Sequence, residues 1–219
     1  MEEHKRIPEI PDHIRRENEK KALRYRMLNQ AAQKGQIVFT GSSLMEQFPI
    51  GELLMSLGIW KVVYNRSFSG YITTELMEVL DDCVLGLEPS KLFINIGTND
   101  LDLIDNPIER LEIHYREILQ RIQYRLPECE TFMLEYYPVC RDTGSIKVPP
   151  GKRIRTKEAV EQGNRVVRKL AREFGCQNIN VNHVLQDEEG YLRPELASDY
   201  IHMWPTAYML ILEELKHYL

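Results

Sequence analysis

The stretch Ile37-Val38-Phe39-Thr40-Gly41-Ser42-Ser43-Leu44 decides the fold that we expect for this chain. Its first four residues are β-branched or aromatic, which is typical of a short, fully buried strand. Gly41 permits a tight turn, and Ser42 or Ser43 can cap a helix that begins next. A serine there sits at the carboxyl end of a strand, where open α/β sheets bind ligands. On this stretch alone, the simpler interpretation is that both serines only form a turn and cap a helix.

Length and composition predict one globular domain spanning residues 1–219. Of these residues 43% are hydrophobic and 28% are charged, which is ordinary for such a domain. A net charge of −5 gives no electrostatic reason to expect nucleic acid or an anionic membrane as a partner. No apolar run approaches the length of a membrane span, and the polar start, residues 1–6, does not resemble a signal peptide.

The cysteines predict reduced thiols in a cytoplasmic protein. They lack the spacing of a metal site and are sparse for a disulfide scaffold, and three lie in or beside apolar segments: the four are Cys83, Cys129, Cys140 and Cys176. We therefore expect no metal and no other cofactor.

Predicted strands alternate with predicted helices along the chain. Residues 1–34 are expected to form an N-terminal arm and a surface helix. Further strands are predicted at 60–65, 91–96, 131–136 and 177–181. Apolar stripes predict helices at 53–57, at 73–84, from about 107 to 126, at 156–174 and after 205. This alternation implies right-handed crossovers and a parallel sheet covered on both faces.

Polar residues follow the predicted strands and should gather at one crevice. A nucleophilic serine needs a base, and the base needs an orienting partner. His202 and Asp199 suit these roles, since their spacing lets the carboxylate hold Nδ1 and leaves Nε2 for Ser43. Gly70 offers an N–H where a side chain would block approach, and Asn99 offers a neutral amide, as an oxyanion requires. Each of these residues taken singly is also explained as a turn, cap or surface residue. Their order along the chain, each in a loop after its own strand, favours a catalytic site.

Four ordered blocks, covering roughly residues 35–215, resemble the SGNH hydrolase superfamily, also called the GDSL-type esterases and lipases. The blocks are Gly41-Ser42-Ser43-Leu44, Ser69-Gly70, Gly97-Thr98-Asn99-Asp100 and Asp199-Tyr200-Ile201-His202. Two positions depart from the family pattern. Ser42 replaces the usual aspartate before the nucleophile, and Ser67 stands where many members carry glycine.

The resemblance implies a flavodoxin-like three-layer α/β/α sandwich with a central parallel sheet of about five strands. It also implies a catalytic triad of Ser43, Asp199 and His202. The oxyanion hole would be formed by Ser43, Gly70 and Asn99.

We therefore expect a serine esterase that hydrolyses carboxylic esters of small molecules, with small acyl or acetyl esters as the leading candidates. A lysophospholipase or a thioesterase remains open within this class. The sequence shows no amphipathic lid of the kind that binds lipid surfaces, which argues against a true lipase. The competing class is a non-catalytic SGNH-fold binding protein. A nucleotide- or flavin-binding protein of similar topology is a third class, but the chain lacks a glycine run that would cradle a phosphate.

The loops after the strands are expected to line the substrate pocket. The 138–155 loop is a candidate lid or substrate wall because it is long and contains proline, glycine and basic residues. Other candidate wall residues are large and mostly apolar, and for any one of them ordinary core or loop packing is the better explanation: Met45, Phe68, Tyr71, Leu101, Tyr136, Tyr137 and Pro138.

Overall fold

Five parallel strands form the central sheet of the computed structural model, which describes residues 11–103, 105–148 and 155–219. Their spatial order is β2-β1-β3-β4-β5. The strands are β1 (Ile37–Gly41), β2 (Val63–Asn65), β3 (Lys91–Asn95), β4 (Glu130–Leu134) and β5 (Gln177–Ile179). This arrangement confirms the predicted parallel sheet and the predicted number of strands.

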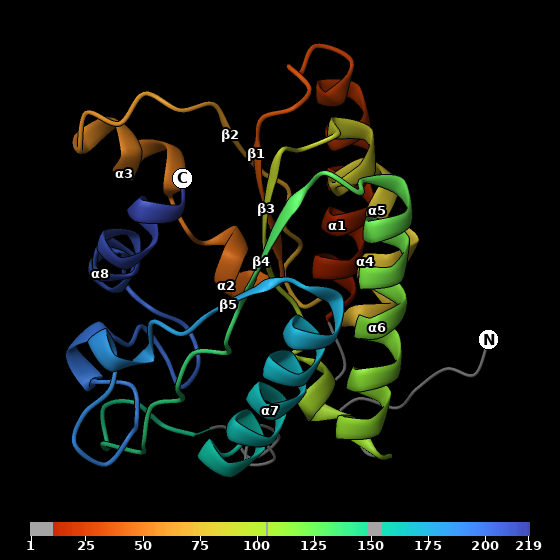
Figure 1. Ribbon diagram of the computed structural model, residues 1–219. Helices are drawn as coiled ribbons and strands as arrows, with labels where there is room; N and C mark the ends of the chain where they lie inside the picture. The colour runs from red at the N-terminus through yellow and green to blue at the C-terminus, as the bar shows by residue number, and fades with distance from the viewer. Residues whose placement is uncertain (1–10, 104, 149–154) are drawn as a thin grey trace.

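Helices cover both faces of the sheet, which confirms the three-layer architecture (Figure 1). One face carries α1 (Asp12–Asn29), α4 (Thr73–Glu78), α5 (Leu80–Cys83), α6 (Pro107–Arg125) and α7 (Lys157–Phe174). The other carries α2 (Ser43–Glu46), α3 (Ile50–Ser56) and α8 (Pro205–Leu215). In the described part of the chain, none of the helices has the length and apolar character that crossing a bilayer requires.

The two faces of the sheet have separate apolar cores, because successive side chains of a strand point to opposite faces. Val38 belongs to the core under α6 and α7, whereas its neighbours on β1 belong to the core under α8. On the α8 side, Phe39 pairs in register with Phe93, and Phe93 with Phe132. The rings stack with centroids 4.6 and 4.5 Å apart. This ladder fixes the register of three adjacent strands and so aligns their carboxyl ends.

Most predicted helix boundaries agree with the structure. Pro107 occupies the first turn of α6, where its missing N–H is not needed. The Thr156 side chain caps α7 by accepting from the Ala159 N–H, and Gly175 ends the helix at φ +67°.

Two predicted elements are shorter than expected. The helix predicted over 73–84 is interrupted at Val79, whose backbone (φ −107°, ψ 11°) is not helical, so the apolar stripe is divided between α4 and α5. The strand predicted over 60–65 pairs only from Val63 onward. Trp60 is 82% exposed, because β2 is an edge strand and the segment before it does not pair with β1.

Candidate active site

Ser43 is the second residue after β1 and the first residue of α2, and it is 9% exposed. Glycine is required before it, since a Cβ on Gly41 would lie 2.1 Å from the carbonyl oxygen of Asn95 on the neighbouring strand. The turn is held further by Ser42, whose N–H donates to that same carbonyl at 3.3 Å. Because the strand order reverses at β1, which lies between β2 and β3, this turn places Ser43 at the crevice between strand ends.

The structure brings His202 and Asp199 together with Ser43. His202 Nε2 lies 2.9 Å from Ser43 Oγ, and His202 Nδ1 lies 2.7 Å from Asp199 Oδ2. The other carboxylate oxygen, Oδ1, accepts from the backbone N–H groups of Ile201 and His202 at 2.8 and 2.7 Å. Since the carboxylate only accepts, it favours the tautomer with the proton on Nδ1, and Nε2 is then free to accept from the serine hydroxyl.

This arrangement lowers the pKa of Asp199. Partial burial raises the pKa of its carboxyl, but the hydrogen bonds from the His202 ring and from two backbone N–H groups outweigh that effect. The net result is a pKa well below the usual range, so Asp199 is ionised at any pH at which the protein would work.

Gly70 and Asn99 lie in the loops that follow β2 and β3. Gly70 has a φ of +78°, a conformation that favours glycine. Asn99 is 8% exposed, and its Nδ2 donates to the carbonyl of Tyr71 at 2.9 Å. Because Tyr71 directly follows Gly70, this hydrogen bond ties the two predicted oxyanion loops together.

Asp100, next to Asn99, binds the start of α4. Its carboxylate accepts from the Thr73 backbone N–H at 3.1 Å and from the Thr73 hydroxyl at 2.5 Å. These hydrogen bonds anchor the loop after β3 to the adjacent helix, so Asn99 is carried by a braced segment.

Helix α1 contacts the loop that carries Gly70, a role that the sequence did not predict. Asn18 is 2% exposed and donates to the Ser69 carbonyl at 2.8 Å, although most of α1 is exposed. Glu46 accepts from the Ser69 N–H at 2.5 Å and pairs with Lys21 of α1. The only sequence signal was an asparagine within a strongly charged helix.

The second unpredicted feature is a buried ion pair between Arg155 and Asp102. Their side chains are 3% and 4% exposed, and the guanidinium also donates to Asn99 Oδ1 at 2.8 Å. Arg155 belongs to the loop that we predicted as a lid or wall. Residues 149–154 of that loop lie outside the described residues, as do residues 1–10 of the N-terminal arm.

The predicted wall residues are mostly core residues. Five side chains are at most 3% exposed and pack in the two apolar cores, so they present no surface to a substrate: Met45, Phe68, Leu101, Tyr136 and Tyr137. Pro138 is also buried, and it borders a cavity together with Glu135 and Asn164. Tyr71 is partly exposed and stacks on Phe68 with ring centroids 4.6 Å apart, so it presents surface to solvent. Large apolar side chains beside strand ends gain most from burial, which explains this outcome.

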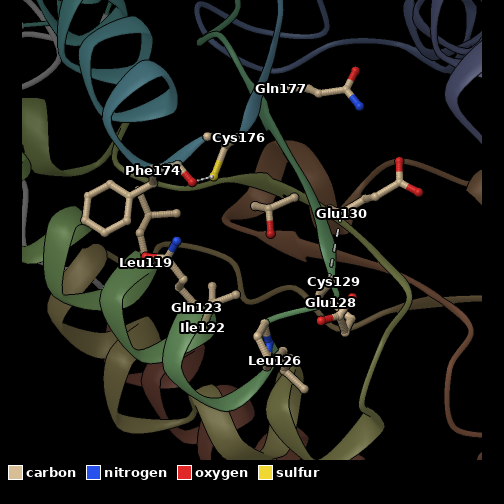
Figure 2. Close-up of a pocket in the computed structure, with 13 residues that line it drawn as sticks. Leu119, Ile122, Gln123, Leu126, Glu128, Cys129, Glu130, Phe174, Cys176 and Gln177 are labelled. Atoms are coloured by element: carbon tan, nitrogen blue, oxygen red, sulfur yellow. Dashed lines mark hydrogen bonds between the residues drawn. The ribbon is translucent and has the colours of Figure 1, made fainter.

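A separate pocket of about 300 Å³, drawn in Figure 2, lies at the amino ends of β4 and β5. Glu130 and Gln177, which border it, are the first residues of β4 and β5, whereas Ser43 and Asn99 follow the carboxyl ends of their strands. Burial raises the pKa of its two thiols, Cys129 and Cys176, to about 11. These thiols are therefore poor nucleophiles.

All four cysteines are free, as expected, and two of them, Cys83 and Cys140, are buried. Burial raises the pKa of Cys83 to about 12. Within the described residues, no three His, Cys, Asp or Glu side chains group in a way that would hold a metal ion.

Comparison with known proteins agrees with the family resemblance and with the fold. The family model of the GDSL-like lipase/acylhydrolase family matches residues 49–210, a range that begins after the block with Ser43. A structure from Streptococcus pneumonia, provisionally described as a platelet activating factor, is 29% identical with a TM-score of 0.84, covering 94% of each chain. No curated protein matches the chain.

Two more distant structures share the fold. A GDSL-like lipase from Bacteroides thetaiotaomicron is 17% identical with a TM-score of 0.72, covering 90% of this chain and 96% of the other. An acetylxylan esterase from Geobacillus stearothermophilus is 15% identical with a TM-score of 0.62, covering 84% of this chain and 94% of the other. The family model spans well over half of the chain. The chain therefore belongs to the GDSL-like lipase/acylhydrolase family, within the SGNH hydrolase superfamily, and is a hydrolase acting on ester bonds.

Proposed function

We propose that the chain is a serine esterase in which Ser43 is the nucleophile, His202 the general base and Asp199 its orienting partner. The observation that carries this proposal is the pair of hydrogen bonds made by the two ring nitrogens of His202. One joins Nε2 to the Ser43 hydroxyl at 2.9 Å, and the other joins Nδ1 to Asp199 at 2.7 Å. Both distances are within the range for direct proton transfer and firm orientation.

In the first half of the reaction, Ser43 Oγ attacks the ester carbonyl carbon while its proton moves to His202 Nε2. The carbonyl oxygen becomes an oxyanion, which accepts from the backbone N–H groups of Ser43 and Gly70 and from Asn99 Nδ2. When the intermediate collapses, His202 protonates the departing alcohol, and the acyl group stays on Ser43. In the second half, His202 takes a proton from water as its oxygen attacks the acyl carbon. The bond from that carbon to Ser43 Oγ then breaks, His202 returns the proton to Oγ, and the carboxylic acid leaves.

The substrate class that we propose is a carboxylic ester of a small molecule with a short acyl group. The acetylxylan esterases among proteins of the same fold make acetylated carbohydrates a substrate class to test. A panel of p-nitrophenyl esters of increasing acyl length, together with acetylated sugars, lysophospholipids and acyl thioesters, ranks these classes by kcat/KM.

The mechanism is tested by substituting each of two neighbouring serines. Ser43→Ala should abolish turnover of p-nitrophenyl acetate while the unfolding midpoint stays that of the wild type. Ser42→Ala is the matched control: it removes a hydroxyl from the same turn, one with only a 3.4 Å contact to Thr98, and should keep turnover. Wild-type rates in Ser43→Ala would refute the proposal.

A further inference from the structure

The side-chain amide of Asn99 is held at both of its ends. Its Oδ1 accepts from Arg155 at 2.8 Å, and its Nδ2 donates to the Tyr71 carbonyl at 2.9 Å. A guanidinium has only donors, and a carbonyl oxygen only accepts. Each neighbour therefore tolerates one orientation of the amide, and the two agree.

Arg155 is itself fixed in place by a carboxylate. Its Nε and one terminal nitrogen donate to the two oxygens of Asp102 at 3.2 and 2.5 Å, in the paired geometry that suits arginine. Both side chains are almost completely buried. A buried ion pair adds little net stability, because the loss of hydration offsets the attraction. What the pair does supply is a rigid donor at a fixed place beside Asn99.

The backbone of Arg155 reaches the other side of the site. Its carbonyl accepts from the Tyr200 hydroxyl at 2.6 Å, and Tyr200 lies between Asp199 and His202 in the chain. One buried residue thus bonds both the loop with the proposed oxyanion donor and the segment with the proposed base.

We propose that Arg155, held by Asp102, is a positioning residue that keeps the donor end of the Asn99 amide toward the oxyanion. The inference rests on the proposed function. Nδ2 has two hydrogens, of which the Tyr71 carbonyl takes one, and the second serves the developing oxyanion. If the amide turned over, Oδ1 would face the oxyanion and repel it. Arg155 and the Tyr71 carbonyl together prevent this, because turning the amide would set Nδ2 against a donor and Oδ1 against an acceptor.

The test is a cycle of variants in two backgrounds. Arg155→Met with Asp102→Leu removes both charges together, so neither is left buried without its partner. In the wild-type background we expect kcat on p-nitrophenyl acetate to fall about 10- to 100-fold, somewhat less than complete loss of an oxyanion donor, with KM unchanged. In the Asn99→Ala background the same pair should cause less than a roughly twofold further loss, because effects that act through one residue are not additive.

Arg155→Lys provides a second measurement that keeps the charge beside Asp102 and therefore the fold. A lysine offers a point charge in place of a planar fork, so we expect a smaller fall in kcat, which again disappears in the Asn99→Ala background. Equal losses in both backgrounds, or no loss in the wild-type background, would overturn the role of Arg155. Ser43→Ala, assayed alongside, keeps the proposed function separate: if that variant turns over ester at the wild-type rate, the mechanism itself is wrong.

Discussion

Replacing Asp199 by asparagine tests how the carboxylate controls His202. Oδ1 of Asp199 accepts from two backbone N–H groups at 2.8 and 2.7 Å, and Oδ2 faces the ring Nδ1 at 2.7 Å. In Asp199→Asn the amide oxygen must stay on the two N–H groups, since the opposite orientation would set an NH₂ group against them. The NH₂ group then faces Nδ1. His202 is therefore driven to the tautomer with its proton on Nε2, which cannot accept a proton from Ser43.

The size of the loss follows from this geometry. A wrong tautomer removes the general base, and the comparable substitution in another serine hydrolase lowers kcat by about 10⁴-fold. Asp199→Ala leaves the tautomer free. The Asp199 side chain is 54% exposed, so water can replace the carboxylate beside Nδ1. The alanine variant thus loses mainly one charge-assisted hydrogen bond of about 1.5–3 kcal/mol, or roughly 10- to 150-fold in rate.

The assay is kcat/KM for p-nitrophenyl acetate, measured for the wild type and both variants with matched unfolding curves. The expected order is wild type, then Asp199→Ala, then Asp199→Asn. An asparagine variant as active as the alanine variant, or more active, would refute the tautomer argument. Equal activity of all three would reduce the site to Ser43 and His202 alone.

Further predictions concern stability and pH. Gly97→Ala should lower the free energy of unfolding, measured in urea, by about 2–5 kcal/mol. Gly97 has a φ of +118°, and a Cβ there would lie 2.1 Å from a buried tyrosine hydroxyl. Gly51→Ala, in an open position on α3, should instead stabilise by up to about 1 kcal/mol. Asn18→Ala should lower the free energy of unfolding by about 1–3 kcal/mol. It should also lower kcat, because the Ser69 carbonyl beside the proposed oxyanion loop loses its donor. An unchanged kcat would contradict an effect of this hydrogen bond on catalysis. The folded-state pKa of Asp199 is depressed, so its stabilising contribution is present above its ordinary value of about 3.9 and is lost as pH falls through the folded value. The stability advantage of wild type over Asp199→Asn, measured by urea unfolding, should therefore shrink as pH is lowered from about 4 to about 2.

Much of the fold could be predicted because burial on both faces leaves a simple record in the sequence. Residues 37–39 and 92–94 are continuous apolar runs, as strands covered on two sides require. The break at Val79 could not be predicted, because the apolar stripe continues across it into α5. Such a break depends on packing against different helices, α4 against α6 and α5 against α1, which periodicity does not record.

The candidate site was predictable where chemistry restricts the residue type. A parallel sheet gathers its strand ends, so Ser43, Asn99 and His202 could be brought together on topology alone. Arg155 could not be found this way. It lies in a basic loop that is typical of a solvated surface, and its burial depends on Asp102, 53 residues earlier. Most of the residues predicted to line the pocket lie in the core for a related reason: an apolar side chain after a strand can face either a cavity or the core, and the sequence does not distinguish the two.

The most direct test of the proposed mechanism is covalent labelling by a fluorophosphonate, which reacts with a serine that a neighbouring base has activated. Wild-type protein should gain one label, and peptide mass analysis should place it on Ser43. Ser43→Ala and His202→Ala should stay unlabelled while remaining folded. A folded wild-type protein that takes no label, or that carries the label on another serine, would contradict Ser43 as the nucleophile.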